Sequence, residues 1–219
     1  MRRNLRELIF RIAIVFSLLI ITNNSFSANN IVDKSQTLTV AVASNFYLPL
    51  TQLIDQSDYW SSQNIKLVSG SSGTLYAQIT KGAPFDLYFS ADQALPKKLE
   101  EKSLGYNRQT YAFGKLVLWS AVQASSAATF IDDTIGVSGK LAIANPKLAP
   151  FGMAANAYLS TFNNAQALNN KLVLGANVTQ AFQFVDSGNA LYGLLAESTL
   201  IQAANALGEP KYLQYALIP

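Results

Sequence analysis

The chain has 219 residues, of which 50% are hydrophobic and only 13% are charged, so it is long enough for one or two domains with a real core. It contains neither cysteine nor histidine, which excludes disulfides, Cys/His metal sites, cysteine nucleophiles and any triad with an imidazole base. The formal net charge of +3 arises in residues 1–27. The remaining chain carries 12 basic and 12 acidic side chains, so no excess of basic residues points to nucleic acid.

The first 27 residues have the three-part pattern of a cleaved secretory signal peptide. Four arginines precede an apolar run at residues 12–21, and the small residues at 25–27 suit cleavage before Ala28. The apolar run is too short to cross a membrane comfortably, although the pattern leaves an uncleaved N-terminal anchor open. We therefore expect residues 1–27 to be removed, residues 28–36 to be a flexible N-terminus and the mature chain to be a periplasmic protein.

The next part of the chain alternates between strand-like and helix-like runs, which is typical of an open parallel sheet. The expected strands are 38–43, 65–69 and 87–90, and the expected helices are 47–57, 74–81 and 93–101. Pro49 is expected in the first turn of the first helix, and Ser72 is well placed as the N-cap of the second. Because ligands bind at the carboxyl ends of such strands, we expect Ser44 and Ser72 on one rim.

The second half of the chain repeats this alternation. After an apolar run at 111–120, the expected strands are 140–144, 171–174 and 191–195, and the expected helices are 153–162, 178–187 and 197–207, the second capped by Asn177. Trp119 is expected in the core or between the halves rather than on a base-stacking surface. No long linker separates the halves. We predict an α/β protein with two lobes, 28–114 and 115–208, a cleft between them and a tail at 209–219.

Four loops of the predicted lobes contain no charged residue. They are Ser44-Asn45, residues 70–74, residues 150–152 and residues 177–179. They offer hydroxyls, an amide and backbone N–H groups at helix starts, where anions bind readily. Hydrogen bonds to a charged partner contribute roughly 1.5–3 kcal/mol each. Since hydrogenphosphate needs an acceptor for its proton, a donor-only site suits a fully deprotonated oxyanion such as sulfate, molybdate or tungstate.

Several of these stretches together resemble the periplasmic molybdate-binding proteins of ABC transporters. They are residues 43–46 (ASNF), 70–78 (GSSGTLYAQ), 82–92 (GAPFDLYFSAD), 111–120, 145–152 and 177–178. The resemblance extends over residues 38–207. It implies a type II binding-protein fold, with a mainly parallel sheet in each lobe, that closes on molybdate or tungstate and delivers it to a membrane permease. We expect a monomer with no enzyme activity, no resident cofactor and no nucleic-acid partner.

The resemblance also implies which residues bind the oxyanion. Ser44 and Ser72 would supply hydroxyl and backbone donors, and Phe151 and Val178 would supply backbone N–H groups, so that no protein atom coordinates the metal directly. In one branch of the family a tyrosine eighteen residues after the valine completes the site. Ala196 occupies that position here, and Asn45 is expected to substitute for the tyrosine.

Three other interpretations remain open. Members of the family usually continue for some tens of residues past the equivalent of Leu217 and return to the first lobe, so the chain could be a truncated, non-functional remnant. It could instead bind another deprotonated oxyanion such as sulfate. An enzyme with Ser44 or Ser72 as nucleophile is the third interpretation. Residues 70–73 lack the G-x-S-x-G spacing of a nucleophile elbow, and Gly73 is not followed by the lysine of a phosphate-binding loop.

Overall fold

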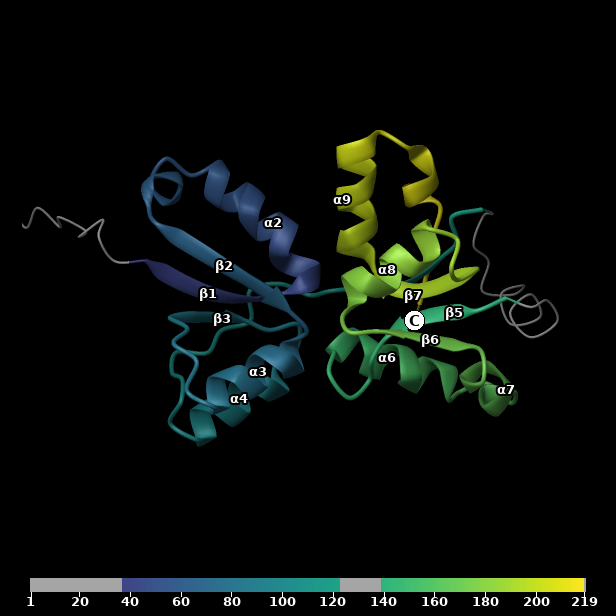
Figure 1. Cartoon of the computed structure of the whole chain (residues 1–219), viewed down its shortest axis with the longest axis horizontal. Helices are drawn as coiled ribbons and strands as arrows, with labels where there is room; N and C mark the ends of the chain where they lie inside the picture. Colours follow the sequence, from purple (N-terminus) through teal and green to yellow (C-terminus); the bar gives the residue numbers. More distant parts are fainter. Residues whose placement is uncertain (1–36, 123–138, 219) are drawn as a thin grey trace, which may run out of the picture. The chain divides into compact units, whose positions relative to one another are not determined.

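The computed structural model describes residues 37–122 and 139–218 (Figure 1). The predicted signal peptide and the expected flexible stretch at 28–36 lie outside the described residues. The described residues belong to one compact unit. Within the described part of the chain, no helix is both long enough and apolar enough to cross a membrane.

The N-terminal part of the fold is built on a three-stranded parallel sheet with the order β2-β1-β3. Its strands are β1 (Leu38–Ala43), β2 (Ile65–Gly70) and β3 (Leu87–Phe89), and its helices are α2 (Ser44–Asp55), η2 (Trp60–Ser62), α3 (Ser72–Thr80) and α4 (Ala94–Glu101). Figure 1 draws α2 on one side of this sheet and α3 and α4 on the other. With helices on both faces, the central strand β1 can be almost wholly apolar, and its last four residues are buried.

The C-terminal part is built on a five-stranded mixed sheet with the order β6-β5-β7-β4-β8. Its strands are β4 (Leu116–Trp119), β5 (Leu141–Ala144), β6 (Leu172–Gly175), β7 (Tyr192–Ala196) and β8 (Ala216–Leu217). Its helices are α6 (Pro150–Leu159), α7 (Ala165–Asn169), α8 (Val178–Asp186), α9 (Glu197–Leu207) and η3 (Pro210–Leu213). Strand β5 runs parallel to β6 and β7, whereas β4 is antiparallel to β7 and β8. The short strand β8 therefore places the tail on this sheet.

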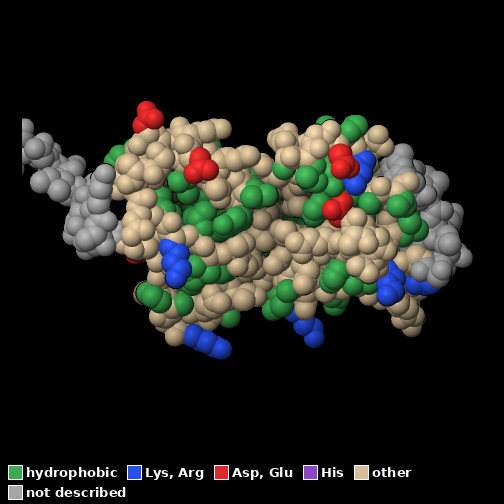
Figure 2. Space-filling view, turned by 45° about the horizontal axis from the view of Figure 1, so that its top comes forward, with side chains coloured by type: hydrophobic (Ala, Val, Ile, Leu, Met, Phe, Trp, Pro, Cys, Tyr) green, Lys and Arg blue, Asp and Glu red, His purple; other side chains and the backbone are tan. Residues whose placement is uncertain are grey.

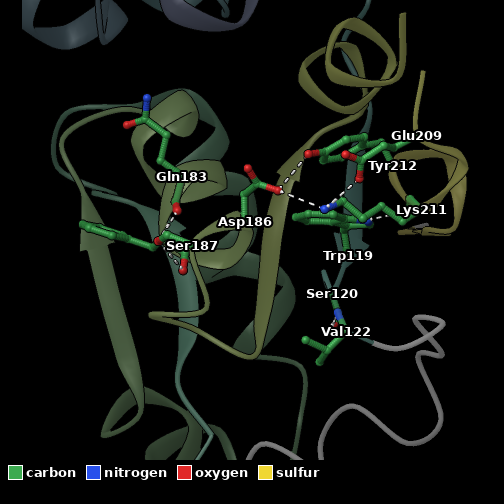
Figure 3. Close-up of polar contacts among 10 residues, drawn as sticks. Trp119, Ser120, Val122, Gln183, Asp186, Ser187, Glu209, Lys211 and Tyr212 are labelled. Carbon is green, nitrogen blue, oxygen red and sulfur yellow. Dashed lines mark hydrogen bonds and ion pairs between the residues drawn. The ribbon is translucent and has the colours of Figure 1, made fainter. Parts of the chain in front are cut away.

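Trp119 at the end of β4 organises the core on one face of the five-stranded sheet. It is fully buried, and its ring stacks on Phe182 and on Tyr212 with centroids 5.5 Å away in each case. Its indole N–H donates to the carbonyl oxygen of Lys211 at 2.9 Å, and the Tyr212 hydroxyl donates to Asp186 at 3.0 Å (Figure 3). The expectation that Trp119 belongs to packing is confirmed, and its contacts also hold η3 against the sheet.

The prediction that Ser72 caps the helix after β2 is wrong. Ser71 is the N-cap of α3, because its Oγ accepts the backbone N–H of Thr74 at 3.3 Å, and Ser72 is the first helical residue. Either serine suits an N-cap by composition. The backbone decides between them, since Ser71 has the extended conformation that an N-cap requires (φ −71°, ψ 148°).

Two helices begin three residues before the predicted positions. Helix α6 begins at Pro150, where proline is favoured because the first helical N–H needs no partner in the helix. Helix α2 begins at Ser44, so that Pro49 is its sixth residue and does not lie in the first turn. Proline has no N–H, and the carbonyl oxygen of Asn45, four residues earlier, is therefore left without its usual helical donor. By contrast, α9 has the predicted bounds.

Candidate functional site

Four helices begin where strands of the two sheets end. Helices α2 and α3 follow β1 and β2, and helices α6 and α8 follow β5 and β6. Residues at or just before these helix starts line one small cavity, together with Ala91. The lining residues are Ala43, Ser44, Asn45, Gly70, Ser71, Ser72, Ala91, Ala149, Pro150, Phe151, Asn177 and Val178. All five residues predicted to bind an oxyanion are in this set, so the fold brings them together.

Ser72 is almost completely buried beside this cavity, with 1% of its surface exposed. Its Oγ accepts the backbone N–H of Ala91 at 3.0 Å and interacts with the Tyr88 hydroxyl, and its single O–H can still donate. The hydroxyl of Tyr88 donates to the carbonyl oxygen of Ser72 at 2.8 Å. Burial raises the pKa of Tyr88 above its ordinary value, so this hydroxyl stays protonated at neutral pH. Two neighbouring groups thus hold Ser72 with its O–H available to a ligand.

Helix α2 reaches the cavity without a side-chain cap. Its N-cap is Ala43, which has no side-chain acceptor, and Ser44 and Asn45 are the first two helical residues. In an α-helix the first four N–H groups have no intrahelical partner. The N–H groups of Ser44 and Asn45 are therefore donors that the helix itself does not use, in line with the predicted role of these residues.

Phe151 is the second residue of α6, which also has no side-chain cap and begins with a proline. The Phe151 ring packs so closely on Gly114 that a Cβ there would lie 2.9 Å from the ring. The ring is thus anchored by packing, and the backbone N–H at the helix start is the polar group that Phe151 can offer. This is the arrangement expected of a residue whose main chain, rather than its side chain, binds a ligand.

Val178 is the first residue of α8, and two side chains bond to the backbone at the start of this helix. The Asn177 side chain accepts the N–H of Gln180 at 3.0 Å, and the Gln180 side chain accepts the N–H of Ala176 at 2.6 Å. The prediction that Asn177 caps this helix is confirmed. The cap engages the third helical N–H and leaves those of Val178 and Thr179 without a helical acceptor.

Ala196 occupies the position where one branch of the family carries a tyrosine. It is fully buried in an apolar cluster that includes Phe151 and Val178. It is not among the residues that line the cavity. A methyl group in this place packs behind two predicted binding residues and offers no hydrogen bond.

The electrostatic potential of the cavity comes from helix termini. None of the described residues that line it is Asp, Glu, Lys or Arg, and on the face shown in Figure 2 the charged side chains form no large patch. The described residues also contain no cluster of three or more Asp or Glu side chains placed to hold a metal ion. Four helix N-termini each present positive partial charge, so the cavity favours an anion held by uncharged donors.

A second, larger cavity adjoins the first, and most of its lining residues were not predicted from the sequence. Its volume is about 300 Å³, and it shares Ser44, Asn45 and Asn177 with the small cavity, whose own volume is about 10 Å³. Amide and hydroxyl side chains of α2, α8 and α9 line much of it. In a sequence, glutamines on a helix surface are expected to face solvent. No local pattern in the sequence indicates that these helices face one another.

Comparison with known proteins shows which family this chain belongs to. Residues 38–215 match the family model described as "Bacterial extracellular solute-binding protein". The molybdate-binding protein ModA of Azotobacter vinelandii is 39% identical over 176 residues, covering 77% of this chain and 68% of that protein. ModA of Rhodobacter capsulatus is 38% identical over 167 residues, covering 74% and 64% respectively.

The solved structure of the Azotobacter vinelandii periplasmic molybdate-binding protein superimposes on 76% of this chain and 74% of its own, with a TM-score of 0.68 and 37% identity. The chain spans about two thirds of the length of the two curated relatives. The predicted fold class, an α/β type II binding protein, is confirmed, as is the resemblance on which it was based. This chain belongs to the family of bacterial extracellular solute-binding proteins.

Proposed function

We propose that this chain is the solute-binding component of a molybdate ABC transporter and that it holds molybdate or tungstate in the small cavity. The observation that carries the proposal is that all five residues implied by the sequence line one cavity without a charged lining residue. The relatives with 39% and 38% identity, both molybdate-binding proteins, support the same ligand class.

Both sheets contribute predicted donors to the cavity. Ser44, Asn45 and Ser72 supply hydroxyl, amide and main-chain donors from the three-stranded side, and Phe151 and Val178 supply main-chain N–H groups from the other. Because no carboxylate lines the cavity, a ligand that keeps a proton has no charged acceptor there. Hydrogenphosphate is therefore disfavoured relative to a doubly charged, fully deprotonated oxyanion.

The size of the cavity sets a condition on binding. Residues that follow strands of both sheets line it. A movement of the helix termini of one sheet relative to those of the other therefore changes the room that an oxyanion has. The division predicted from the sequence, with lobes at 28–114 and 115–208 and a tail at 209–219, supplies two bodies that could make this movement.

The remaining parts of the proposal concern the cellular context. We propose that residues 1–27 are cleaved, that the mature protein is periplasmic and monomeric, and that a membrane permease receives its ligand. A transport role needs no enzyme activity and no nucleic-acid partner.

Calorimetry and thermal unfolding of the mature protein with molybdate, tungstate, sulfate and phosphate test the proposal. Ligand at about 100 times its dissociation constant should stabilise the protein by roughly 2.7 kcal/mol. We expect that stabilisation with molybdate and tungstate and little with phosphate. A shift with sulfate alone would reassign the ligand while keeping the site, and no shift with any of the four anions would contradict the proposal.

A further inference from the structure

A main-chain hydrogen bond joins the two sheets beside the cavity. The N–H of Gly73, the second residue of α3, donates to the carbonyl oxygen of Leu148 at 2.8 Å. Leu148 lies in the turn before α6, where its own N–H donates to the carbonyl oxygen of Asn145 at 3.0 Å. The donor therefore lies in the first turn of one helix that borders the cavity, and the acceptor belongs to the turn that leads into another.

Glycine at position 73 is required by this approach and not by the backbone conformation. A Cβ on Gly73 would lie 2.6 Å from the Leu148 carbonyl oxygen, which is closer than real Cβ atoms come, and a tight 3.2 Å from the Leu148 Cα. Yet Gly73 is helical and is not among the residues with positive φ in the described chain. Alanine would thus suit the helix better than glycine does, and only the contact with Leu148 calls for the missing side chain.

A second contact between the sheets lies on the α9 side. The hydroxyl of Ser198, in the first turn of α9, donates to the carbonyl oxygen of Asn45 at 3.2 Å. That oxygen is free to accept because Pro49 has no N–H to offer it. One turn farther along, the Gln202 amide donates to the Gln52 side chain at 3.2 Å, so the same pair of helices is joined twice.

We propose that Gly73 and Ser198 are affinity-determining positions for the oxyanion although neither lines the cavity. Their hydrogen bonds form only when the helices of the two sheets are drawn together, and so they stabilise the ligand-enclosing arrangement over a more open one. This inference rests on the proposed function, since it concerns closure around the same ligand. A bond that exists only in the closed arrangement slows ligand release more than it speeds capture.

The test compares Gly73→Ala with Gly105→Ala in the full mature protein, with molybdate as the probe. At Gly105 an added Cβ meets only the Leu99 Cβ at an ordinary 3.6 Å. We expect Gly73→Ala to raise the Kd by about tenfold or more, mainly through faster dissociation, because it removes a hydrogen bond and adds a clash. Thermal unfolding without ligand should be unchanged or slightly raised for Gly73→Ala, and Gly105→Ala should leave the Kd within about twofold of the parent value.

Ser198→Ala provides a second variant that introduces no clash. Its control is Ser160→Ala, which removes a hydroxyl that bonds only within its own helix, to the carbonyl oxygen of Ala157. We expect Ser198→Ala to raise the Kd by about three- to tenfold, and Ser160→Ala to have no such effect.

Three results are distinguishable. If the parent protein does not bind molybdate, the proposed function fails. If the parent binds and both Gly73→Ala and Ser198→Ala bind equally well, the function stands and this inference is overturned. A rise in Kd matched by an equal loss of stability without ligand would also overturn it, because a general structural defect would then explain the effect.

Discussion

The three-stranded and five-stranded sheets each contribute two helix N-termini to the cavity, yet they differ in how deeply they are buried. Every residue of β5 and β7 is buried, whereas no residue of β2 or β3 is. Leu87 in β3 is 46% exposed, and Phe113, which precedes β4, is 89% exposed. The two regions therefore contribute equally many helix N-termini to the cavity, although their strands are buried to different degrees. We expect the five-stranded sheet to dominate global stability and the elements around the three-stranded sheet to open more readily.

We expect the largest loss of stability from a substitution in the core of the five-stranded sheet. Trp119→Ala removes a fully buried ring that stacks on Phe182 and on Tyr212, and it should lower the free energy of unfolding by about 3–5 kcal/mol. Denaturant unfolding without ligand measures this loss.

Phe113→Ala is the matched control, because it deletes an aromatic ring of similar type that is 89% exposed. Its effect should stay within about 0.5 kcal/mol. Similar losses for both variants would show that the difference in burial between the two regions does not set stability.

Substitutions of two adjacent serines at the start of α3 should affect different quantities, one mainly ligand binding and the other mainly stability. Ser72→Ala removes a hydroxyl available to the ligand and should weaken molybdate binding by roughly 1.5–3 kcal/mol, the range for hydrogen bonds to charged partners. Ser71→Ala removes the N-cap and should lower the free energy of unfolding by about 1 kcal/mol, with a smaller effect on the Kd. Titration calorimetry and denaturant unfolding of each variant provide both quantities. Equal and negligible changes in Kd would show that the predicted role of Ser72 is wrong.

The smallest effect concerns a surface pair beside the three-stranded sheet. The side chain and the backbone N–H of Arg108 both donate to the Glu100 carboxylate, at 3.0 and 2.9 Å, and hold the pKa of Glu100 below its ordinary value. A carboxyl whose pKa is lower in the folded state stabilises the fold above its unfolded pKa, and this contribution is lost as the pH falls through the folded pKa. Arg108→Gln should therefore weaken the pH dependence of unfolding in the acidic range below the ordinary glutamate pKa. If the stability of the variant depends on acidic pH as that of the parent protein does, Arg108 does not stabilise the fold through Glu100.

Much of the fold could be predicted because its strands and helices have strong local signals. The apolar run of β1, the Asn177 cap and the helix from Glu197 to Leu207 each follow from neighbouring residues. The strand–helix alternation then indicates that these strands are parallel. The antiparallel pairing of β4 with β7 and the placement of β8 are decided by contacts between distant segments, so local patterns do not contain them.

The residues of the candidate site could be predicted, whereas the contacts that hold them in place could not. The family resemblance of the helix-start loops implies Ser44, Asn45, Ser72, Phe151 and Val178, and these residues line one cavity. The contacts of Ser72 with Tyr88 and Ala91 join residues far apart in the sequence. The choice between Ser71 and Ser72 as N-cap depended on a backbone conformation that composition does not specify.

By itself the sequence determined a charge-poor, donor-rich set of loops without cysteine or histidine, and hence the class of ligand that such loops can hold. Backbone N–H groups at helix starts are donors whatever the tertiary arrangement, which is why this much could be inferred locally. Only the tertiary structure decided that four of these helix starts meet, and that Gly73 and Leu148 approach closely enough to exclude a side chain. Those facts depend on the distance between two sheets, and packing of the whole chain sets that distance.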